Sequence, residues 1–208
     1  MKRNLKILLC LTLIISAVLS QGLSLQVDAS TYRKAGTPTD GEYVTFTENN
    51  IKTTDMRKKS KLDAAKFSEY MKKFPNLSGI DETILKIQDE YNVNALFILA
   101  IIRLESGNGT STIAQSKNNL GGIIVSENSV AVFKTFDTQT DCIIYMANLL
   151  SKNYLTEGGK YFSGYTLTDI AQRYSTSPNE WSELITNMIY QIQTDLDGTK
   201  TVKISESS

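Results

Sequence analysis

Residues 93–109 of the chain read Val-Asn-Ala-Leu-Phe-Ile-Leu-Ala-Ile-Ile-Arg-Leu-Glu-Ser-Gly-Asn-Gly, and we expect the rest of the domain to pack around them. The apolar run begins after Asn94, whose side chain is suited to cap the first turn of a helix. Apolar residues fill almost every position up to Arg103, so the pattern predicts a helix that is buried on most of its faces. Gly107 suits the left-handed residue that closes a helix, which places Glu105 in the last turn.

Glu105 stands out because an acid at the end of such a helix is unfavourably placed. Burial disfavours the charged carboxylate, and the negative end of the helix dipole disfavours it further, so its pKa should be raised. A carboxylic acid that stays protonated near neutral pH is what a general acid requires. The alternative is a glutamate at a solvated helix end, and the physical argument alone leaves both interpretations open.

The composition of the 208-residue chain narrows the chemistry. It contains no histidine, which excludes Ser-His-Asp and Cys-His nucleophilic sites and disfavours the usual catalytic zinc sites. Its 22 basic and 22 acidic residues lack the strongly basic balance typical of nucleic-acid-binding proteins. We therefore expect no metal, no cofactor and no nucleic-acid partner, and a chemistry that rests on carboxylates assisted by tyrosine or backbone groups.

The N-terminus has the three parts of a secretory signal peptide. Three basic residues among the first six precede an apolar segment at 7–19, and a polar stretch ending at Ala29 follows. We interpret residues 1–29 as a cleaved signal peptide and expect a secreted protein with no membrane attachment after cleavage. Without them the chain holds 19 basic and 21 acidic residues, a net charge of −2. An uncleaved anchor is the alternative, although the apolar segment is short for a full span.

The hydrophobic pattern beyond residue 29 divides the chain into three parts. Residues 30–60 are polar and predict a loosely held leader, whereas residues 195–208 predict a polar tail. Residues 61–194 carry helical periodicity and predict one folded domain.

Within that domain we expect helices around a single small β-hairpin, and therefore an α+β fold that is mostly helical. The hairpin is predicted from two apolar stretches at 123–125 and 130–136, which are separated by polar residues. Asp81 and Asp137 each precede a helical pattern, and their carboxylates are expected to cap the helices that follow.

Several sequence blocks around the buried helix carry a resemblance. They are Tyr-Asn-Val-Asn-Ala at 91–95, Glu-Ser-Gly-Asn-Gly-Thr-Ser at 105–111 and Lys-Asn-Asn-Leu-Gly-Gly-Ile at 117–123. Shorter blocks at 133–136 and 174–178 and the residue Trp181 agree in order and spacing. Together these blocks resemble the glucosaminidase domains of bacterial cell-wall hydrolases, the family 73 glycoside hydrolases, over residues 62–193.

The resemblance implies a lysozyme-like α+β fold with the hairpin lobe flanking a cleft. It implies a cell-wall enzyme that acts on peptidoglycan glycan strands and cleaves the β-1,4 backbone on the reducing side of N-acetylglucosamine. Glu105 matches the essential general acid of the family, which protonates the glycosidic oxygen as the leaving sugar departs. On this basis residues 61–194 form the catalytic domain.

The second catalytic group stays open at this point. Glu127 is the only acid in the predicted hairpin and is a candidate base or nucleophile, although a solvated turn residue is the alternative. In a substrate-assisted reaction the sugar's 2-acetamido group attacks instead, and Tyr174, which matches a family tyrosine, would position it. For Tyr174 the alternative is a ring in the core at the end of a short helix. Asn119 is a further candidate for substrate binding, although a role in closing its loop explains it as well.

One position departs from the family pattern. The family often has an aromatic residue where Gly121 stands, so a possible sugar-stacking platform is missing. Trp181 lies in a helical pattern and is expected in the core, not against a sugar.

Other activities on the same polymer share the sequence pattern of a helix that ends in Glu-Ser. A lytic transglycosylase or a muramidase is one alternative, and a transglycosylase needs a single acid. A non-catalytic wall-binding module is an alternative from another class, although it would not need a buried acid. We expect a monomer.

Overall fold

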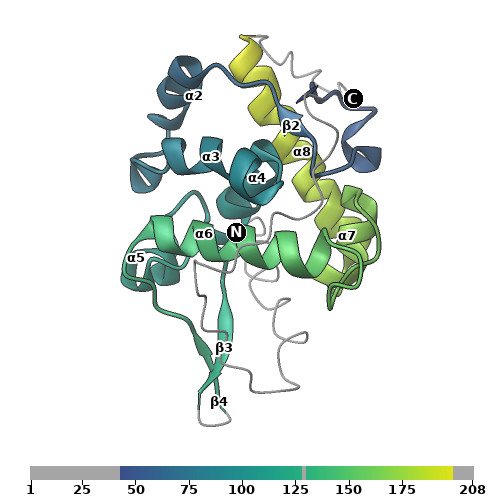
Figure 1. Cartoon of the computed structure of the whole chain (residues 1–208). Coiled ribbons are helices and arrows are strands. Elements are labelled where there is room, and N and C mark those ends of the chain that lie inside the picture. The colour runs from purple at the N-terminus through teal and green to yellow at the C-terminus, as the bar shows by residue number, and fades with distance from the viewer. Residues whose placement is uncertain (1–42, 128–129, 199–208) are drawn as a thin grey trace, which may run out of the picture.

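The computed structural model describes residues 43–127 and 130–198, which form a helical body with one projecting hairpin (Figure 1). The predicted signal peptide, the first part of the predicted leader and the last ten residues lie outside the described residues. In chain order the elements are β1 (Tyr43–Val44), η3 (Ile51–Thr53), β2 (Lys59–Ser60), α2 (Ala64–Met71), η4 (Pro75–Leu77), α3 (Asp81–Tyr91), α4 (Ala95–Ser106), α5 (Thr112–Lys117), β3 (Ile124–Glu127), β4 (Val130–Phe133), α6 (Gln139–Leu149), the π-helical turn η5 (Leu150–Tyr154), α7 (Leu167–Tyr174) and α8 (Pro178–Asp197).

Helix α4 lies at the centre of the helical body, between α3 and α8 (Figure 1). The side chain of Asn94 accepts hydrogen bonds from the backbone N–H groups of Leu96 and Phe97, at 2.9 and 3.1 Å. Gly107 closes the helix in the left-handed conformation, with φ of 60°. All but one of the helix residues are buried, which confirms the buried helix predicted from residues 93–109.

Two helix caps differ from those expected. Thr138, not Asp137, caps α6: the threonine side chain and Asp141 bond to each other's backbone N–H in a reciprocal capping box. This arrangement satisfies two helix N–H groups at once, whereas an aspartate one residue earlier would satisfy one. Asp81 is the first residue of α3 itself, and its carboxylate accepts a hydrogen bond from the hydroxyl of Ser68 on α2.

The folded body begins well before residue 61, so the predicted leader of residues 30–60 is wrong from Tyr43 onward. Phe46, Ile51 and Met56 are each 3% exposed or less and belong to the core. Strand β1 pairs in parallel with β2, and the backbone N–H of Met56 donates to a carbonyl just before α7 at 2.9 Å. The three core side chains are five residues apart, a spacing that follows neither helical nor strand periodicity and so does not indicate a shared buried face.

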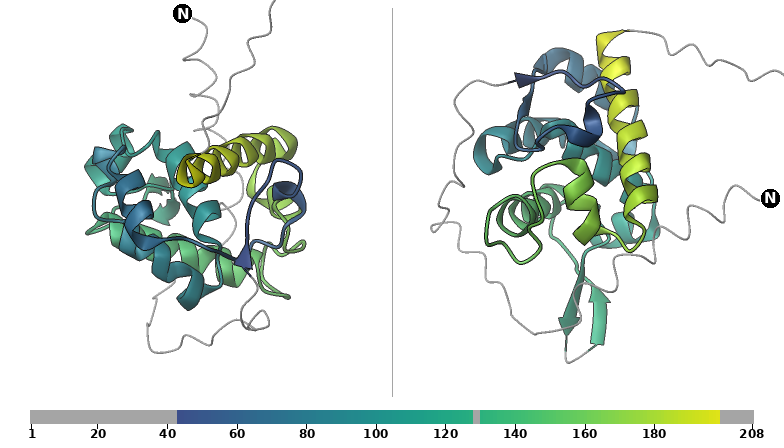
Figure 2. Two further views of the ribbon diagram at one scale, coloured as in Figure 1. Left: turned by 90° about the horizontal axis from the view of Figure 1, so that it is seen from above. Right: turned by 90° about the vertical axis from the view of Figure 1, so that its right-hand side faces the viewer.

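The hairpin is present as expected, with β3 and β4 antiparallel and Glu127 opposite Val130. Figure 1 and the right-hand view of Figure 2 both show it projecting beyond the helices, next to α5 and α6. At the other end of the chain, α8 continues to Asp197 and is closed by Gly198, so the helix extends past the predicted start of the tail at residue 195. In the part of the chain that the structure describes, no helix is both long and apolar enough to cross a membrane.

A chain that begins at residue 61 should be much less stable than one that begins at Tyr43. Burial of a large apolar side chain contributes about 1.5–3 kcal/mol, so loss of Phe46, Ile51 and Met56 removes a large part of the roughly 5–15 kcal/mol that stabilises a domain. Urea unfolding of both chains, followed by circular dichroism, measures the difference. Equal unfolding midpoints for the two chains would show that residues 43–60 do not stabilise the fold.

Candidate functional site

Glu105 lies in the last turn of α4 with 7% of its surface exposed. Burial raises the pKa of its carboxyl to about 7, and a hydrogen bond from Trp181 acts in the opposite direction. The indole Nε1–H of Trp181 donates to Oε1 of Glu105 across 3.4 Å. The raised pKa expected for this residue is therefore confirmed, and burial is its main cause. A carboxylic acid with this pKa is half protonated near neutral pH and can donate a proton there.

The turn that follows Glu105 is held by a compact set of hydrogen bonds. The hydroxyl of Ser106 donates to the carbonyl of Ile102 at 2.6 Å and accepts the N–H of Gly109 at 2.8 Å. A side chain at Gly109 would have its Cβ 2.8 Å from the backbone oxygen of Asn76, so the turn packs directly on the preceding η4 segment. This packing fixes the end of α4, and with it the direction of Glu105.

Arg103 fixes the same end of the helix from another side. Its Nε donates to Oδ1 of Asn108 at 2.8 Å, and another guanidinium nitrogen donates to the hydroxyl of Tyr70 at 2.5 Å. The guanidinium also lies over the ring of Phe74, 4.2 Å from its centroid. The side chain of Arg103 is thus bound to α2 and to the turn after α4.

Three aromatic rings extend from Glu105 through the core. The ring of Trp181 stacks on that of Tyr174 with centroids 4.6 Å apart, and Tyr174 contacts Tyr154 at 5.4 Å. The pKa of Tyr174 is raised well above its ordinary value. Burial is the main cause, and the nearby carboxyl of Glu105 is the second. Tyr174 therefore stays a neutral phenol, which can donate a hydrogen bond at any physiological pH.

Trp181 is the residue of this site whose contact was not anticipated. Its place in the core is confirmed, because its side chain is 5% exposed. Its contact with Glu105 joins residues 76 positions apart, and no periodic pattern reports on such a distance. The only available signal was its inclusion among the sequence blocks that carry the family resemblance.

Asn119 lies at the base of the hairpin with 1% of its surface exposed. Its Nδ2 donates to the carbonyls of Ile123 and Lys134 at 2.8 and 2.9 Å, and its Oδ1 accepts the N–H of Ile123 at 2.8 Å. Asn118 likewise donates to two carbonyls just beyond β4. Both side chains close the loop and hold the hairpin in place, which is the structural role considered for them. Substrate contact by Asn119 stays a prediction.

Glu127 is exposed at the end of β3 that lies farther from the helices. In the described part of the chain, no hydrogen bond or ion pair joins it to Glu105 or Tyr174, so its catalytic role stays a prediction.

The carboxylate of Asp141 takes part in the capping box of α6. Residues 43–127 and 130–198 contain no group of three or more His, Cys, Asp or Glu side chains that could hold a metal ion.

Gly121 shows why this chain has no aromatic residue at that position. A Cβ there would lie 2.6 Å from Sδ of Met146 and 2.9 Å from its Cε. The side chain of Met146, on α6, therefore occupies the space that a larger residue would need. A larger residue at this place would require the side chain of Met146 to shift.

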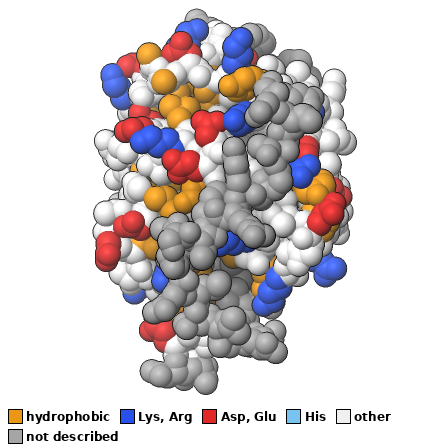
Figure 3. Space-filling model, in the orientation of Figure 1, with side chains coloured by type: hydrophobic (Ala, Val, Ile, Leu, Met, Phe, Trp, Pro, Cys, Tyr) orange, Lys and Arg blue, Asp and Glu red, His pale blue; other side chains and the backbone are white. Residues whose placement is uncertain are grey.

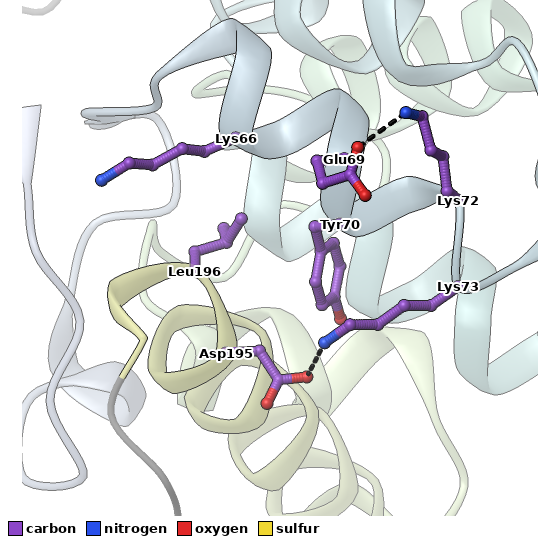
Figure 4. Close-up of a pocket in the computed structure, with 7 residues that line it drawn as sticks. All are labelled: Lys66, Glu69, Tyr70, Lys72, Lys73, Asp195 and Leu196. Atoms are coloured by element: carbon purple, nitrogen blue, oxygen red, sulfur yellow. Dashed lines mark hydrogen bonds and ion pairs between the residues drawn. The ribbon is translucent and has the colours of Figure 1, made fainter.

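A surface cavity of about 460 Å³ lies elsewhere, between α2 and the C-terminal end of α8 (Figure 4). Two ion pairs occupy much of its wall, Lys72 with Glu69 at 2.6 Å and Lys73 with Asp195 at 3.3 Å. Asp195 is 14 residues beyond Trp181 on α8, roughly 21 Å along the helix axis. Over the face shown in Figure 3, basic and acidic side chains are interspersed. None of the candidate site residues lines this cavity.

Comparison with known proteins points to one family. Residues 81–194 match the glucosaminidase family model, described as mannosyl-glycoprotein endo-beta-N-acetylglucosaminidase. Two proteins from Streptococcus pneumoniae strains, both named as endo-beta-N-acetylglucosaminidases, are each 32% identical to the chain over 117 residues. The match covers 56% of this chain but only 18% and 16% of the two relatives, so the chain spans less than a fifth of their length.

Solved structures show the same fold. Autolysin E of S. aureus superimposes with a TM-score of 0.57 and 18% identity, over 74% of this chain and 75% of that one. A catalytic glutamate-to-alanine mutant of autolysin E in complex with the disaccharide NAG-NAM gives 0.55 and 17%, over 71% and 73% of the two chains. The lysozyme-like, mostly helical fold expected from the sequence is thereby confirmed.

Replacing Glu105 with glutamine should stabilise the protein at alkaline pH. The carboxyl ionises near its ordinary value of 4.5 in the unfolded chain and near pH 7 in the fold, so stability falls as pH rises between these values. The full effect is roughly 3 kcal/mol at about 1.4 kcal/mol per pKa unit.

Urea unfolding of the wild type and Glu105→Gln at pH 4 and pH 8 measures this effect. The stability of the variant relative to the wild type should rise by most of that amount between the two pH values. A relative stability that stays constant across this range would show that Glu105 titrates like an exposed glutamate.

Proposed function

Because the chain belongs to the family of mannosyl-glycoprotein endo-β-N-acetylglucosaminidases, we propose that it is a secreted glycoside hydrolase that cleaves the β-1,4 glycan backbone of peptidoglycan. The bond cleaved lies on the reducing side of N-acetylglucosamine, as the family resemblance implies. The observation that carries the proposal is a buried carboxyl, Glu105, with a pKa of about 7 at the end of the central helix.

The choice of peptidoglycan is supported by what the structural neighbours hold. Autolysin E has been solved with the disaccharide NAG-NAM and with the muropeptide NAM-L-Ala-D-iGlu. The predicted signal peptide at residues 1–29 would bring this chain to the same polymer outside the cell. The two supports are independent, since one comes from the fold and the other from the N-terminal sequence.

Glu105 acts as the general acid in the proposed reaction. Protonated in its buried position, it gives its proton to the glycosidic oxygen while the sugar ring passes through an oxocarbenium-like transition state. Cleavage leaves a carboxylate in a site that disfavours charge, which in turn favours its reprotonation. The residue needs no metal or cofactor for this step.

For the second group we favour Tyr174 with substrate assistance over Glu127. The charge of Glu105 acts on the nearby hydroxyl of Tyr174. The ring of Tyr174 also stacks on Trp181, which contacts Glu105. Its neutral hydroxyl could donate to the carbonyl oxygen or accept from the N–H of a 2-acetamido group, and so hold that group against the anomeric carbon. A carboxylate partner would have to lie about 5–9.5 Å from Glu105, whereas Glu127 is on the projecting hairpin.

Glu105→Gln should lower the rate of cell-wall lysis about 10²–10⁴-fold, the usual contribution of a general acid. Turbidity loss of purified cell walls measures the rate. Glu90→Gln, at an exposed position of α3, is the matched control and should lyse at the wild-type rate. Lysis by Glu105→Gln at the wild-type rate would rule out the proposed mechanism.

Mass analysis of the fragments from the same digestion identifies the bond. The proposal predicts reducing N-acetylglucosamine ends. Reducing N-acetylmuramic acid ends would instead assign a muramidase, and anhydro-muramic ends a lytic transglycosylase. A protein that binds walls and releases no fragments would be a binding module.

Tyr174→Phe and Glu127→Gln separate the two candidates for the second group. The proposal predicts a loss of about 10²-fold for Tyr174→Phe, comparable to loss of a transition-state hydrogen-bond donor, and a change of less than about threefold for Glu127→Gln, typical of an exposed charge. The measurement is the lysis rate at the pH optimum of each variant. The reverse order of effects would assign the role to Glu127 and reject substrate assistance.

A further inference from the structure

The carboxyl of Glu105 has one hydrogen-bond donor among the described residues, the indole N–H of Trp181. Both side chains are buried, at 7% and 5% exposed, so water does not easily replace this bond. The contact is specific to one atom, because the N–H is directed at Oε1. The two oxygens of the acid are therefore not equivalent.

We propose that Trp181 is a positioning residue for Glu105: its indole N–H holds Oε1, so that Oε2 is the oxygen that carries the proton to the glycosidic bond. The inference rests on the proposed role of Glu105 as the general acid and adds which oxygen acts and what selects it.

The donor chemistry of the indole gives the direction. An indole N–H can only donate, so the oxygen facing it must offer a lone pair. In a protonated carboxyl one oxygen is of the carbonyl type and the other bears the hydrogen. The carbonyl type is the better acceptor, so Oε1 takes that form and the hydrogen resides on Oε2. Trp181 thus sets the arrangement of the acid before substrate binds.

The indole is held rigidly enough to impose this arrangement. Its ring stacks on Tyr174 at 4.6 Å with an interplanar angle of 29°, and Tyr174 is backed by Tyr154. Trp181 lies in the first turn of α8, where its backbone N–H donates to the carbonyl of Ser177 at 3.0 Å. Three elements, α7, α8 and η5, therefore fix one N–H group relative to α4.

The same bond has a second effect, on the pH range of the acid. Burial favours the neutral carboxyl and the N–H favours the carboxylate, so removing the N–H should raise the pKa of Glu105 above about 7. The titratable group that faces Glu105 from α7 is Tyr174, which stays neutral because its own pKa is raised. Arg103, on α4 itself, is bound to Tyr70 and Asn108.

Trp181 is the only tryptophan of the chain, which allows an isosteric test. Growth on 3-benzothienylalanine replaces the indole N–H with sulfur while keeping the shape of the ring, so stacking on Tyr174 is preserved. Trp181→Phe removes the same N–H by mutation, together with part of the ring that stacks on Tyr174. Tyr190→Phe, on the same helix, is a matched control that loses a polar hydrogen from an aromatic residue elsewhere.

Infrared difference spectra between acid and alkaline pH give a readout that loss of packing alone would not mimic. The carbonyl band of the protonated carboxyl is assigned to Glu105 by its absence from Glu105→Gln. Loss of the N–H should move this band to higher frequency in the benzothienyl protein and in Trp181→Phe. The band should stay in place in Tyr190→Phe.

The pH profile of cell-wall lysis is the second readout. Without the N–H, the alkaline limb of the profile should shift upward by about half to one pH unit, because Glu105 then stays protonated to a higher pH. An unchanged band and an unchanged limb in the benzothienyl protein would overturn the inference, even if Glu105→Gln is inactive. Wild-type lysis by Glu105→Gln would instead reject the underlying proposal for Glu105. The two failures are therefore distinguishable.

Discussion

Helix α4 is buried on nearly every side, and this burial determines how the neighbouring elements are arranged. A helix of this composition cannot face water, so α3, α8 and the segment around β2 all pack against it. The helix must nevertheless end somewhere, and the turn at Gly107 closes it inside the body of the protein. Glu105 lies one residue from the end of α4 and two before that glycine. Its carboxyl is therefore buried by the same packing that stabilises the fold.

The site then follows from what surrounds the end of α4. Burial disfavours the ionised form of Glu105, and the indole N–H of Trp181 on α8 favours it. Asn119 holds the base of the hairpin by bonds to backbone, so the hairpin is anchored to the loop that follows α5. Burial of this carboxyl costs stability at neutral pH, because water hydrates the ionised group in the unfolded chain and the fold removes that hydration. The residue responsible for that cost is Glu105, the proposed general acid.

The sequence predicts the local features well and the distant contacts poorly. Asn94, the apolar run and Gly107 lie within one stretch, and their periodicity and capping chemistry suffice to predict α4 and the setting of Glu105. The hairpin follows from two apolar stretches and a polar break. Thr138 caps α6 because the two reciprocal hydrogen bonds between Thr138 and Asp141 stabilise the helix end more than the one bond that Asp137 could make. Phe46, Ile51 and Met56 are spaced with neither helical nor strand periodicity. The segment η3, which contains Ile51, packs against α7 and α8, which come over a hundred residues later. The contact between Trp181 and Glu105 likewise depends on tertiary packing alone.

The proposed mechanism requires that Glu105 stays a neutral acid up to about neutral pH. The most direct measurement is the titration of its side-chain carboxyl carbon by NMR in the wild-type protein, with the resonance assigned from Glu105→Gln. We expect a single midpoint near pH 7, to which burial raises the pKa. A midpoint near the ordinary value of 4.5 would mean that Glu105 is ionised at neutral pH and unable to serve as the acid.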